Sequence, residues 1–386
     1  MKFLRLQLPI FTAIRTVFNT AHRMVYPFLA VFARGLGVDI HAMSLVLTAR
    51  SVVGGLGPFL ASLSDRRGRQ FGMLLGPGMF TLGAALVVFW PTFQALALAL
   101  ILTTLGKYIF DPSMQAYLGD RVPYERRGLA IAVTEFSWSL AFIIGIPLMG
   151  FIIARRGWMA PFPLLTLLGL LTIAALVVML PKESRQQNSN RLWVNFRTVL
   201  THVPALAGLS IGLWASTANE VVNLIFGVWL EDAFGLQIAA LGAASAVIGI
   251  SELGGEGLVA AFADRLGKPR AVGLGLMANS LAALALPFLG RTTVGALVGL
   301  FLFYITFEFT LVSVIPMMTE VLPEARATLM AFNVAGLSFG RALGAPLAPW
   351  LYGFGFPVVA AVAVVFNGFA LLALWKMGRG TRPSPP

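Results

Sequence analysis

The chain lacks cysteine altogether and has only three histidines. Without cysteine there is no disulfide framework, thiol chemistry or Cys-based metal site, and the histidines show no ligand spacing. We therefore expect no metal and no cofactor. Charge is also scarce, because 11% of the 386 residues are charged, whereas roughly a quarter are charged in an average soluble domain. With 58% hydrophobic residues, this composition predicts a chain whose surface faces a lipid bilayer.

The net charge of +12 raises the question of a nucleic-acid partner. The 28 basic residues are scattered between apolar segments, a pattern that suits a membrane protein better, and we expect no nucleic acid to bind. The first apolar run, residues 8–33, is too long for the core of a signal peptide and lacks a small-residue cleavage site. We expect it to be retained as a membrane helix.

Apolar runs follow one another along the whole chain. About 20 apolar residues cross a bilayer as a helix, and loops rich in charge, proline and glycine separate the runs. The sequence therefore predicts an all-α membrane protein with twelve spans, at residues 8–33, 42–62, 71–90, 94–118, 128–153, 159–180, 204–230, 239–262, 271–289, 293–319, 328–353 and 356–376.

The basic residues predict how these spans are oriented. If the N-terminus is cytoplasmic, nineteen of the 28 lysines and arginines fall in inner loops and tails, four in outer loops and five within spans. Lys and Arg concentrate on the cytoplasmic side of membrane proteins. We therefore expect both termini to be cytoplasmic, in a multi-pass protein of the inner (cell) membrane.

One long loop, residues 181–203, divides the chain. Its second part, "RLWVNFRTVL", places Trp193, Phe196 and Leu200 on one helical face, which predicts a short amphipathic helix on the inner membrane surface. The two sides of this loop resemble each other: "SDRRGR" at 64 matches "ADRLGK" at 263, and two further pairs follow in the same order at offsets of 199 or 200 residues. We infer a duplication, with bundles of six spans at 1–180 and 204–378, a linker at 181–203 and a disordered tail at 379–386.

Together these features resemble the major facilitator superfamily. Twelve spans as six plus six, a central cytoplasmic loop and a D-R-x-G-R motif after span 2 are typical of that family. The motif is matched by Asp65, Arg66, Gly68 and Arg69, whereas Ala61 and Gln70 depart from it at its two ends. The resemblance implies a secondary transporter, not an enzyme, that moves a small molecule by rocking two halves around a central site. It also leads us to expect a monomer.

Two further motifs bear on this resemblance. The segment after span 4, with Asp120, Pro123 and Arg126–Gly128, is similar to the family, but Leu100 stands where an arginine is usual within span 4. In span 5, "GIPLMG" at 145–150 is similar to the glycine-proline motif of proton-driven exporters in the superfamily.

The repeated basic clusters lie at the predicted inner corners of both halves. There they can reach helix C-termini or acids of a neighbouring span when the inner gate is shut. The alternative is that they only set topology, for which an acid such as Asp65 contributes little. We assign a gating role to Asp65, Arg66, Arg69, Asp120, Arg127, Asp264 and Arg265.

Charges within the spans need a reason, since one at mid-bilayer costs at least about 2.5–3.5 kcal/mol. The first half holds Arg15, Arg23, Arg50, Lys107, Asp111 and Glu135, and the second holds Glu220, Glu252, Glu256, Glu308 and Arg341. Spans 3, 6, 9 and 12 hold none, which predicts that these four face lipid. A substrate between the halves would meet a positive wall and a negative wall.

We expect the substrate to be bound by basic residues of the first half and by aromatic residues near the charges. These are Arg23, Arg50, Lys107, Tyr26, Trp138, Trp214, Tyr304 and Phe307. Simpler interpretations exist. Lys107 and Asp111 are spaced i, i+4 and would neutralise each other, Arg15 would extend toward the inner surface, Arg341 would pair with Glu308, and the aromatic rings would only pack.

Glu252 and Glu256 lie one turn apart in "SELGGEG". Repulsion between two poorly solvated carboxylates favours a proton held on one of them, as a proton-coupled carrier requires. We assign proton coupling to this pair, followed by Glu220, Glu308 and Glu135; the alternative is that arginines such as Arg341 neutralise the pair.

The sequence thus predicts a proton-coupled exporter of a small organic molecule, amphipathic or charged. The alternative is a proton-coupled importer of an organic anion or zwitterion. An enzyme would need a nucleophile–base set or a metal cluster at membrane depth, and the sequence shows neither. No phosphate-binding loop of the G-x-x-x-x-G-K-[ST] type is present, so ATP is not the direct energy source. Sodium stays open as the coupling ion.

Overall fold

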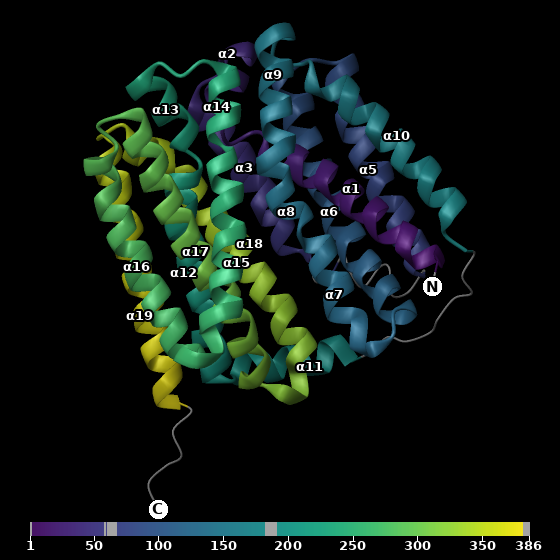
Figure 1. The fold of residues 1–386 in the computed structure, drawn as a ribbon, viewed down its shortest axis with the longest axis vertical. Helices are drawn as coiled ribbons and strands as arrows, with labels where there is room; N and C mark the ends of the chain where they lie inside the picture. Colours follow the sequence, from purple (N-terminus) through teal and green to yellow (C-terminus); the bar gives the residue numbers. More distant parts are fainter. Residues whose placement is uncertain (1, 58, 60–67, 182–190, 381–386) are drawn as a thin grey trace, which may run out of the picture. The chain divides into compact units, whose positions relative to one another are not determined.

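The computed structural model describes residues 2–57, 59, 68–181 and 191–380. Its described residues form helices joined by short turns, and none of them lies in a β-strand (Figure 1). The helices of the first half are α1 (Lys2–Arg23), α2 (Leu29–Leu36), α3 (Ile40–Gly55), α5 (Arg69–Phe89), α6 (Phe93–Arg121), α7 (Tyr124–Glu135), α8 (Ser137–Leu140), η1 (Ala141–Gly145), α9 (Ile146–Arg156) and α10 (Pro161–Met179).

The described residues of the second half also form helices. Its helices are α11 (Arg191–Thr201), α12 (Val203–Asn223), α13 (Phe226–Phe234), α14 (Ile238–Ala244), α15 (Ala246–Leu266), α16 (Lys268–Leu289), α17 (Thr293–Val321), η2 (Pro323–Ala325), α18 (Arg326–Tyr352) and α19 (Phe356–Gly380).

Many of these helices are long and apolar enough to cross a membrane. Nine described helices or continuous helix runs meet that condition, and the bent pair α2 and α3, which turns by 113°, would make ten. The helices α1 and α18, which hold predicted spans 1 and 11, are long enough but carry too many polar residues to be counted. The number twelve therefore stays a prediction, as does the cytoplasmic side of the termini.

The internal repeat is visible in the helix ends. The helices α5 and α16 begin 199 residues apart, and α6 and α17 match at both ends at an offset of 200. Thr92 and Thr292 cap α6 and α17 in the same way, each accepting a hydrogen bond from the backbone N–H three residues on. Gly68 and Gly267 both have positive φ, at 98° and 80°, just before α5 and α16. Part of each half therefore repeats the same helix starts and caps at the offset seen in the sequence.

The chain divides into two compact units. Unit 1 comprises Met1–Ser189 and Leu236–Gly249, and unit 2 comprises Asn190–Gly235 and Ile250–Pro386. The stretch 236–249 belongs to unit 1 because α14 packs along α9. The predicted division into bundles at 1–180 and 204–378, with a linker and tail, stays a prediction.

Within unit 1, α5 packs between α6 and α10 (Figure 1). The apolar contacts include stacked rings of Phe18 and Phe80, whose centroids are 4.3 Å apart. In unit 2, α12 packs against both α18 and α19. A polar contact joins α16 to α19 there, because Asn367 donates to Asn279 at 2.8 Å and Asn279 donates in turn to the carbonyl of Phe303 at 2.7 Å.

The predicted lipid-facing spans differ in burial. The least buried candidate spans are those of α10, α19 and α16, the predicted spans 6, 12 and 9, whereas α5, the predicted span 3, is as buried as α6 and α17. The helix predicted in the central loop is present as α11. It packs against α12 and α18, with Val199 fully buried and the rings of Phe196 and Phe332 4.9 Å apart, so part of the face predicted for the membrane contacts protein.

Candidate functional site

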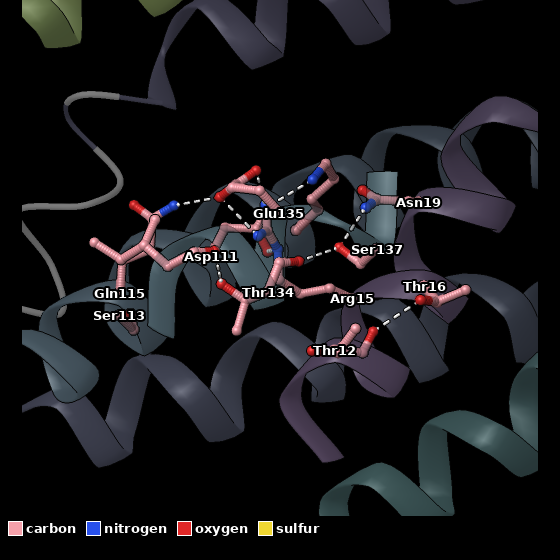
Figure 2. A network of polar contacts seen from close by, with 12 residues as sticks. Thr12, Arg15, Thr16, Asn19, Asp111, Ser113, Gln115, Thr134, Glu135 and Ser137 are labelled. Carbon is pink, nitrogen blue, oxygen red and sulfur yellow. Dashed lines mark hydrogen bonds and ion pairs between the residues drawn. The ribbon is translucent and has the colours of Figure 1, made fainter. Parts of the chain in front are cut away.

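A partly buried ion-pair network joins three helices of unit 1 (Figure 2). Arg15 on α1 holds Glu135 at the end of α7 with both of its Nη atoms, at 2.7 and 3.0 Å, and its Nε donates to Asp111 on α6 at 3.2 Å. Lys107, one turn before Asp111, contacts the other carboxylate oxygen at 2.5 Å. Gln115 donates to Glu135 at 2.9 Å. Two cations and two acids therefore balance within this cluster.

This network decides between interpretations that the sequence left open. The i, i+4 pair of Lys107 and Asp111 is present. Arg15 does not extend to the surface, since its side chain is 4% exposed and faces two carboxylates. A guanidinium presents several donors in one plane, which lets Arg15 join acids on two different helices.

Arg50 on α3 lies apart from these acids. Its side chain is 1% exposed. Its Nη1 donates to the carbonyl of His22 at 2.7 Å and its Nη2 to the hydroxyl of Tyr26 at 2.9 Å. Nε of Arg50 has no acceptor among the described residues. The charge of Arg50 is thus held by neutral oxygens.

Arg23, the last residue of α1, lies between two aromatic rings. Its guanidinium carbon is 4.0 Å from the centroids of both Trp138 and Phe142, and its Nη1 donates to the carbonyl of Trp138 at 3.1 Å. The ammonium of Lys107 also lies 5.3 Å from the Trp138 ring. Of the predicted aromatic residues, Trp138 and Tyr26 therefore contact basic groups of the first half.

The first predicted span is broken close to these contacts. The helix α1 ends at Arg23 and α2 begins at Leu29, with turns between them. Span 7 has a shorter break, between Asn223 and Phe226. Interrupted membrane helices expose backbone donors and acceptors at membrane depth, and such breaks are tolerated where protein surrounds them.

In unit 2 the predicted proton-coupling acids lie on α12, α15 and α17. Glu252 is 3% exposed and Glu256 is half-buried. Gly255 brings α17 close, because a Cβ built on it would lie 2.7 Å from the Cβ of Glu308. A third carboxylate side chain therefore begins beside the turn that carries the pair.

Glu220 on α12 is fully buried. Asn223 donates to it at 3.3 Å, and the hydroxyl of Tyr304 donates to Asn223 at 2.8 Å. Sequence reasoning selected Glu220 and Tyr304 but missed Asn223, whose place one turn after Glu220 was the available signal. The other two predicted aromatic residues pack in apolar surroundings: Trp214 stacks on Phe366 at 5.8 Å, and Phe307 joins an apolar cluster.

The span-5 motif coincides with an irregular helix. A turn of π-helix, η1, ends at Gly145, and such turns are frequent at functional sites. A Cβ on Gly145 would lie 1.9 Å from Oγ1 of Thr20 on α1, and a Cβ on Gly150 would lie 3.1 Å from the Cα of Gly242 on α14. The two glycines let span 5 approach one neighbour on each side.

Metal chemistry has no visible site in the described part of the chain, where no three His, Cys, Asp or Glu residues are placed to hold an ion.

Comparisons with known proteins agree with this architecture. The sequence profile of the Major Facilitator Superfamily matches residues 12–319 and, separately, residues 209–386. The chain belongs to the major facilitator superfamily. The second match starts within the second half, as expected of a duplicated chain.

Individual relatives are distant but extend over most of the chain. The inner membrane transport protein YdhP of Escherichia coli (strain K12) is 26% identical over 91% of this chain and 90% of its own length. The multidrug resistance protein MdtH of Photorhabdus laumondii is 25% identical over 86% of this chain and 83% of its own length. The crystal structure of a bacterial homologue of the human lysosomal transporter Spinster has the same fold, with a TM-score of 0.79 and 16% identity over 100% of this chain and 99% of that one.

The protein is therefore a secondary transporter of this superfamily, a multi-pass protein of the inner membrane that binds small molecules, and not an enzyme. The resemblance inferred from the D-R-x-G-R motif and the six-plus-six pattern is confirmed.

Five of the seven residues assigned to gating lie in the described part of the chain, at or near helix ends. Asp65 and Arg66 lie outside the described residues. Arg69, at the start of α5, is 3.6 Å from Asp120 near the end of α6, and Lys268 pairs with Glu320 at the corresponding ends of α16 and α17. These two ion pairs lie within their own units.

The other gating residues close turns or face outward. Arg127 donates from Nε to the carbonyl of Val122 at 3.0 Å. Arg326, which was not among the residues assigned to gating, starts α18 in the second half and donates to the carbonyl of Thr319 at 2.9 Å. Asp264 and Arg265 are exposed at the end of α15.

Proposed function

We propose that this transporter exports a small organic molecule, amphipathic or charged, in exchange for protons by alternating access. The observation that carries the proposal is the separation of membrane charge between the units. Basic side chains with aromatic neighbours lie in unit 1, at Arg23 and Arg50, and buried carboxylates lie in unit 2, at Glu220, Glu252 and Glu308. Ionisable residues at membrane depth mark substrate paths and proton relays.

Two observations support the outward direction. The relative MdtH is named a multidrug resistance protein. The span-5 motif contains Gly145 and Gly150, whose positions allow the close approaches to α1 and α14 described above. Exporters of the superfamily carry a similar glycine-proline motif at this place.

The proposed proton site is the pair Glu252 and Glu256. Both lie on α15, one turn apart, and the side chain of Glu308 begins beside Gly255 between them. Like charges this close in a poorly solvated place favour a shared proton. Glu220, Glu308 and Glu135 follow as the next proton-coupling candidates.

We propose that the inner ends of both units form the gate. Asp65, Arg66, Arg69, Asp120, Arg127, Asp264 and Arg265 carry out this role. The exchange of ion-pair partners at such helix ends would accompany rocking of the units. The transporter is expected to work as a monomer.

The test is flux in proteoliposomes with an imposed pH gradient. The purified protein is reconstituted with a pH-sensitive dye inside, and a panel of amphipathic cations, anions and neutral compounds is added one at a time. Proton movement that follows one compound and needs the protein supports coupling. Transport of that compound at equal rates with and without the gradient would show that protons do not drive it.

We expect Glu252→Gln and Glu256→Gln to abolish gradient-driven transport while substrate–substrate exchange persists. Glutamine has nearly the shape of glutamate but holds no exchangeable carboxyl proton, so packing survives and proton release is lost. Both rates are measured for the compound found in the panel. Glu324→Gln, on the exposed turn η2, is the matched control and should keep both activities. If transport in both variants depends on the gradient as in the wild type, another residue carries the proton, and Glu220 and Glu308 would be tested next.

The second candidate function is proton-coupled import of an organic anion or zwitterion. It is favoured by Arg50, a buried cation held by neutral oxygens alone. Everted and right-side-out membrane vesicles separate the two functions, because an exporter accumulates the compound in everted vesicles and an importer in right-side-out vesicles.

A further inference from the structure

The charges of unit 1 can be assigned to partners one by one. Its predicted spans hold four cations and two acids. Arg15 and Lys107 together contact both carboxylates, those of Asp111 and Glu135. Neither acid contacts Arg50, whose only hydrogen-bond partners in the described chain are the His22 carbonyl and the Tyr26 hydroxyl.

A buried guanidinium without an anion is unusual. Buried charges in proteins are normally paired, because transfer of an ion out of water is expensive and neutral acceptors compensate it only in part. Arg50 is 1% exposed, and its Nε hydrogen has no acceptor among the described residues. Nε and the adjoining Nη atom form the edge of a guanidinium that binds the two oxygens of a carboxylate side by side.

The surroundings of Arg50 add a second favourable feature for an anion. Its two acceptors lie at and within the break in span 1, since His22 is in the last turn of α1 and Tyr26 is in the turn before α2. The helix α2 begins at Leu29 without a side-chain cap from Phe28, and its first residues are buried. The N–H groups of a first helical turn lack intrahelical acceptors and carry partial positive charge, so they also favour an anion.

The second half has no counterpart of this arrangement. At the offset of 199 residues, the position of Arg50 corresponds to Gly249, and the break of span 7 follows the buried acid Glu220. The cationic break is thus a property of the first half alone.

We propose that Arg50, beside the break in span 1, binds a carboxylate group of the transported molecule. This inference rests on the proposed function only in that unit 1 binds the substrate. It narrows the substrate to organic carboxylates, including zwitterions such as amino acids. Lys107 and Arg15 contact acids of the protein, whereas Arg50 contacts neutral oxygens, so Arg50 is the residue that we assign to the carboxylate.

The test measures equilibrium binding to the purified full-length protein in detergent, without a gradient. The probes are a panel of aliphatic, aromatic and amino carboxylates, each with its amide and its amine analogue, and inorganic phosphate. Thermal stabilisation of the wild type identifies a ligand, and quenching of tryptophan fluorescence gives its Kd. We expect at least one carboxylate to bind while its amide and amine do not.

The variants locate the site. Arg50→Gln should weaken binding of that carboxylate at least tenfold, and Arg50→Lys, which keeps the charge but loses the two-pronged edge, should weaken it less. Arg156→Gln, at an exposed arginine at the end of α9, is the matched control and should bind normally. The comparison of carboxylate with amide uses the wild type alone, so it stands even if Arg50→Gln does not fold.

Three outcomes would overturn the proposal: no carboxylate binds better than its amide, the Kd is unchanged in Arg50→Gln, or inorganic phosphate binds as well as the best carboxylate. Binding through Arg50 without proton-driven flux would contradict proton coupling but support this inference. Proton-driven flux of compounds without a carboxylate would support proton coupling but overturn this inference.

Discussion

At the scale of single residues, Arg15 shows how one side chain can organise a membrane interior. It comes from α1 and holds Asp111 on α6 and Glu135 on α7. Each of these acids would be costly within the membrane without a cation. The network therefore joins three helices through charge, with Arg15 and Asp111 shielded from solvent more than Glu135.

We expect Arg15→Gln to destabilise the protein by about 3 kcal/mol, at the low end of values for breaking a buried ion pair, because Glu135 is 42% exposed. The variant leaves Asp111 and Glu135 with one cation instead of two. The measurement is the melting temperature of the purified protein by size-exclusion chromatography after heating.

The double variant Arg15→Gln/Glu135→Gln is the control for this prediction. It removes one of the two acids that the single variant leaves, so it should recover part of the lost stability. A double variant that melts no higher than Arg15→Gln would mean that packing of the arginine stem, and not its charge, is what matters.

At the scale of helices, close crossings depend on glycine. The helices α5 and α6 meet at Gly76 and Gly106, and a Cβ built on Gly106 would lie 2.4 Å from the carbonyl oxygen of Gly76. Small residues at such crossings let membrane helices approach until their backbones touch. The obstacle at Gly106 is backbone, which cannot rotate away as a side chain would.

Gly106→Ala is therefore expected to lower the melting temperature and the folded yield strongly. The matched control is Gly78→Ala on α5, where a Cβ would meet nothing within 4 Å. That change should be neutral or stabilising by up to about 1 kcal/mol, since alanine is the better helix former. Equal melting temperatures for the two variants would contradict the close crossing.

At the scale of the whole molecule, the chain combines a duplicated helical arrangement with unequal charge. The matching caps at Thr92 and Thr292 show the duplication. The positions equivalent to Arg50 and Lys107, namely Gly249 and Phe307, carry no charge. The two halves therefore share helix ends but differ in the chemistry of single side chains.

The orientation in the membrane can be tested directly, because the chain has no cysteine of its own. A single cysteine at Arg156→Cys should react with a membrane-impermeant maleimide in intact cells, since the positive-inside pattern places residues 154–158 outside. A single cysteine at Ser189→Cys, in the central loop, should react only in everted vesicles. Labelling of the cysteine at position 189, and not of the one at position 156, in intact cells would mean that the chain has the opposite orientation.

The sequence by itself determined the class of this protein. Apolar runs of about 20 residues are a consequence of bilayer thickness, so composition alone was enough for an all-α membrane protein. The repeat at 199–200 residues and the motif around Asp65 were enough for the superfamily. The helix breaks after Arg23 and before Phe226 were not foreseen, because glycine and proline are tolerated within membrane helices and do not mark where one ends.

Only the tertiary structure decided which charges neutralise each other. Arg15, Asp111 and Glu135 are 96 to 120 residues apart in pairs that touch, and no local pattern records such a contact. The pair of Lys107 and Asp111 was visible as a spacing, but its alternative, a free lysine facing substrate, was equally compatible with the sequence. The role of a buried charge depends on the side chains that the fold places against it. Arg50 and Lys107 look alike in the sequence, and only the structure shows that Lys107 contacts an acid whereas Arg50 contacts neutral oxygens.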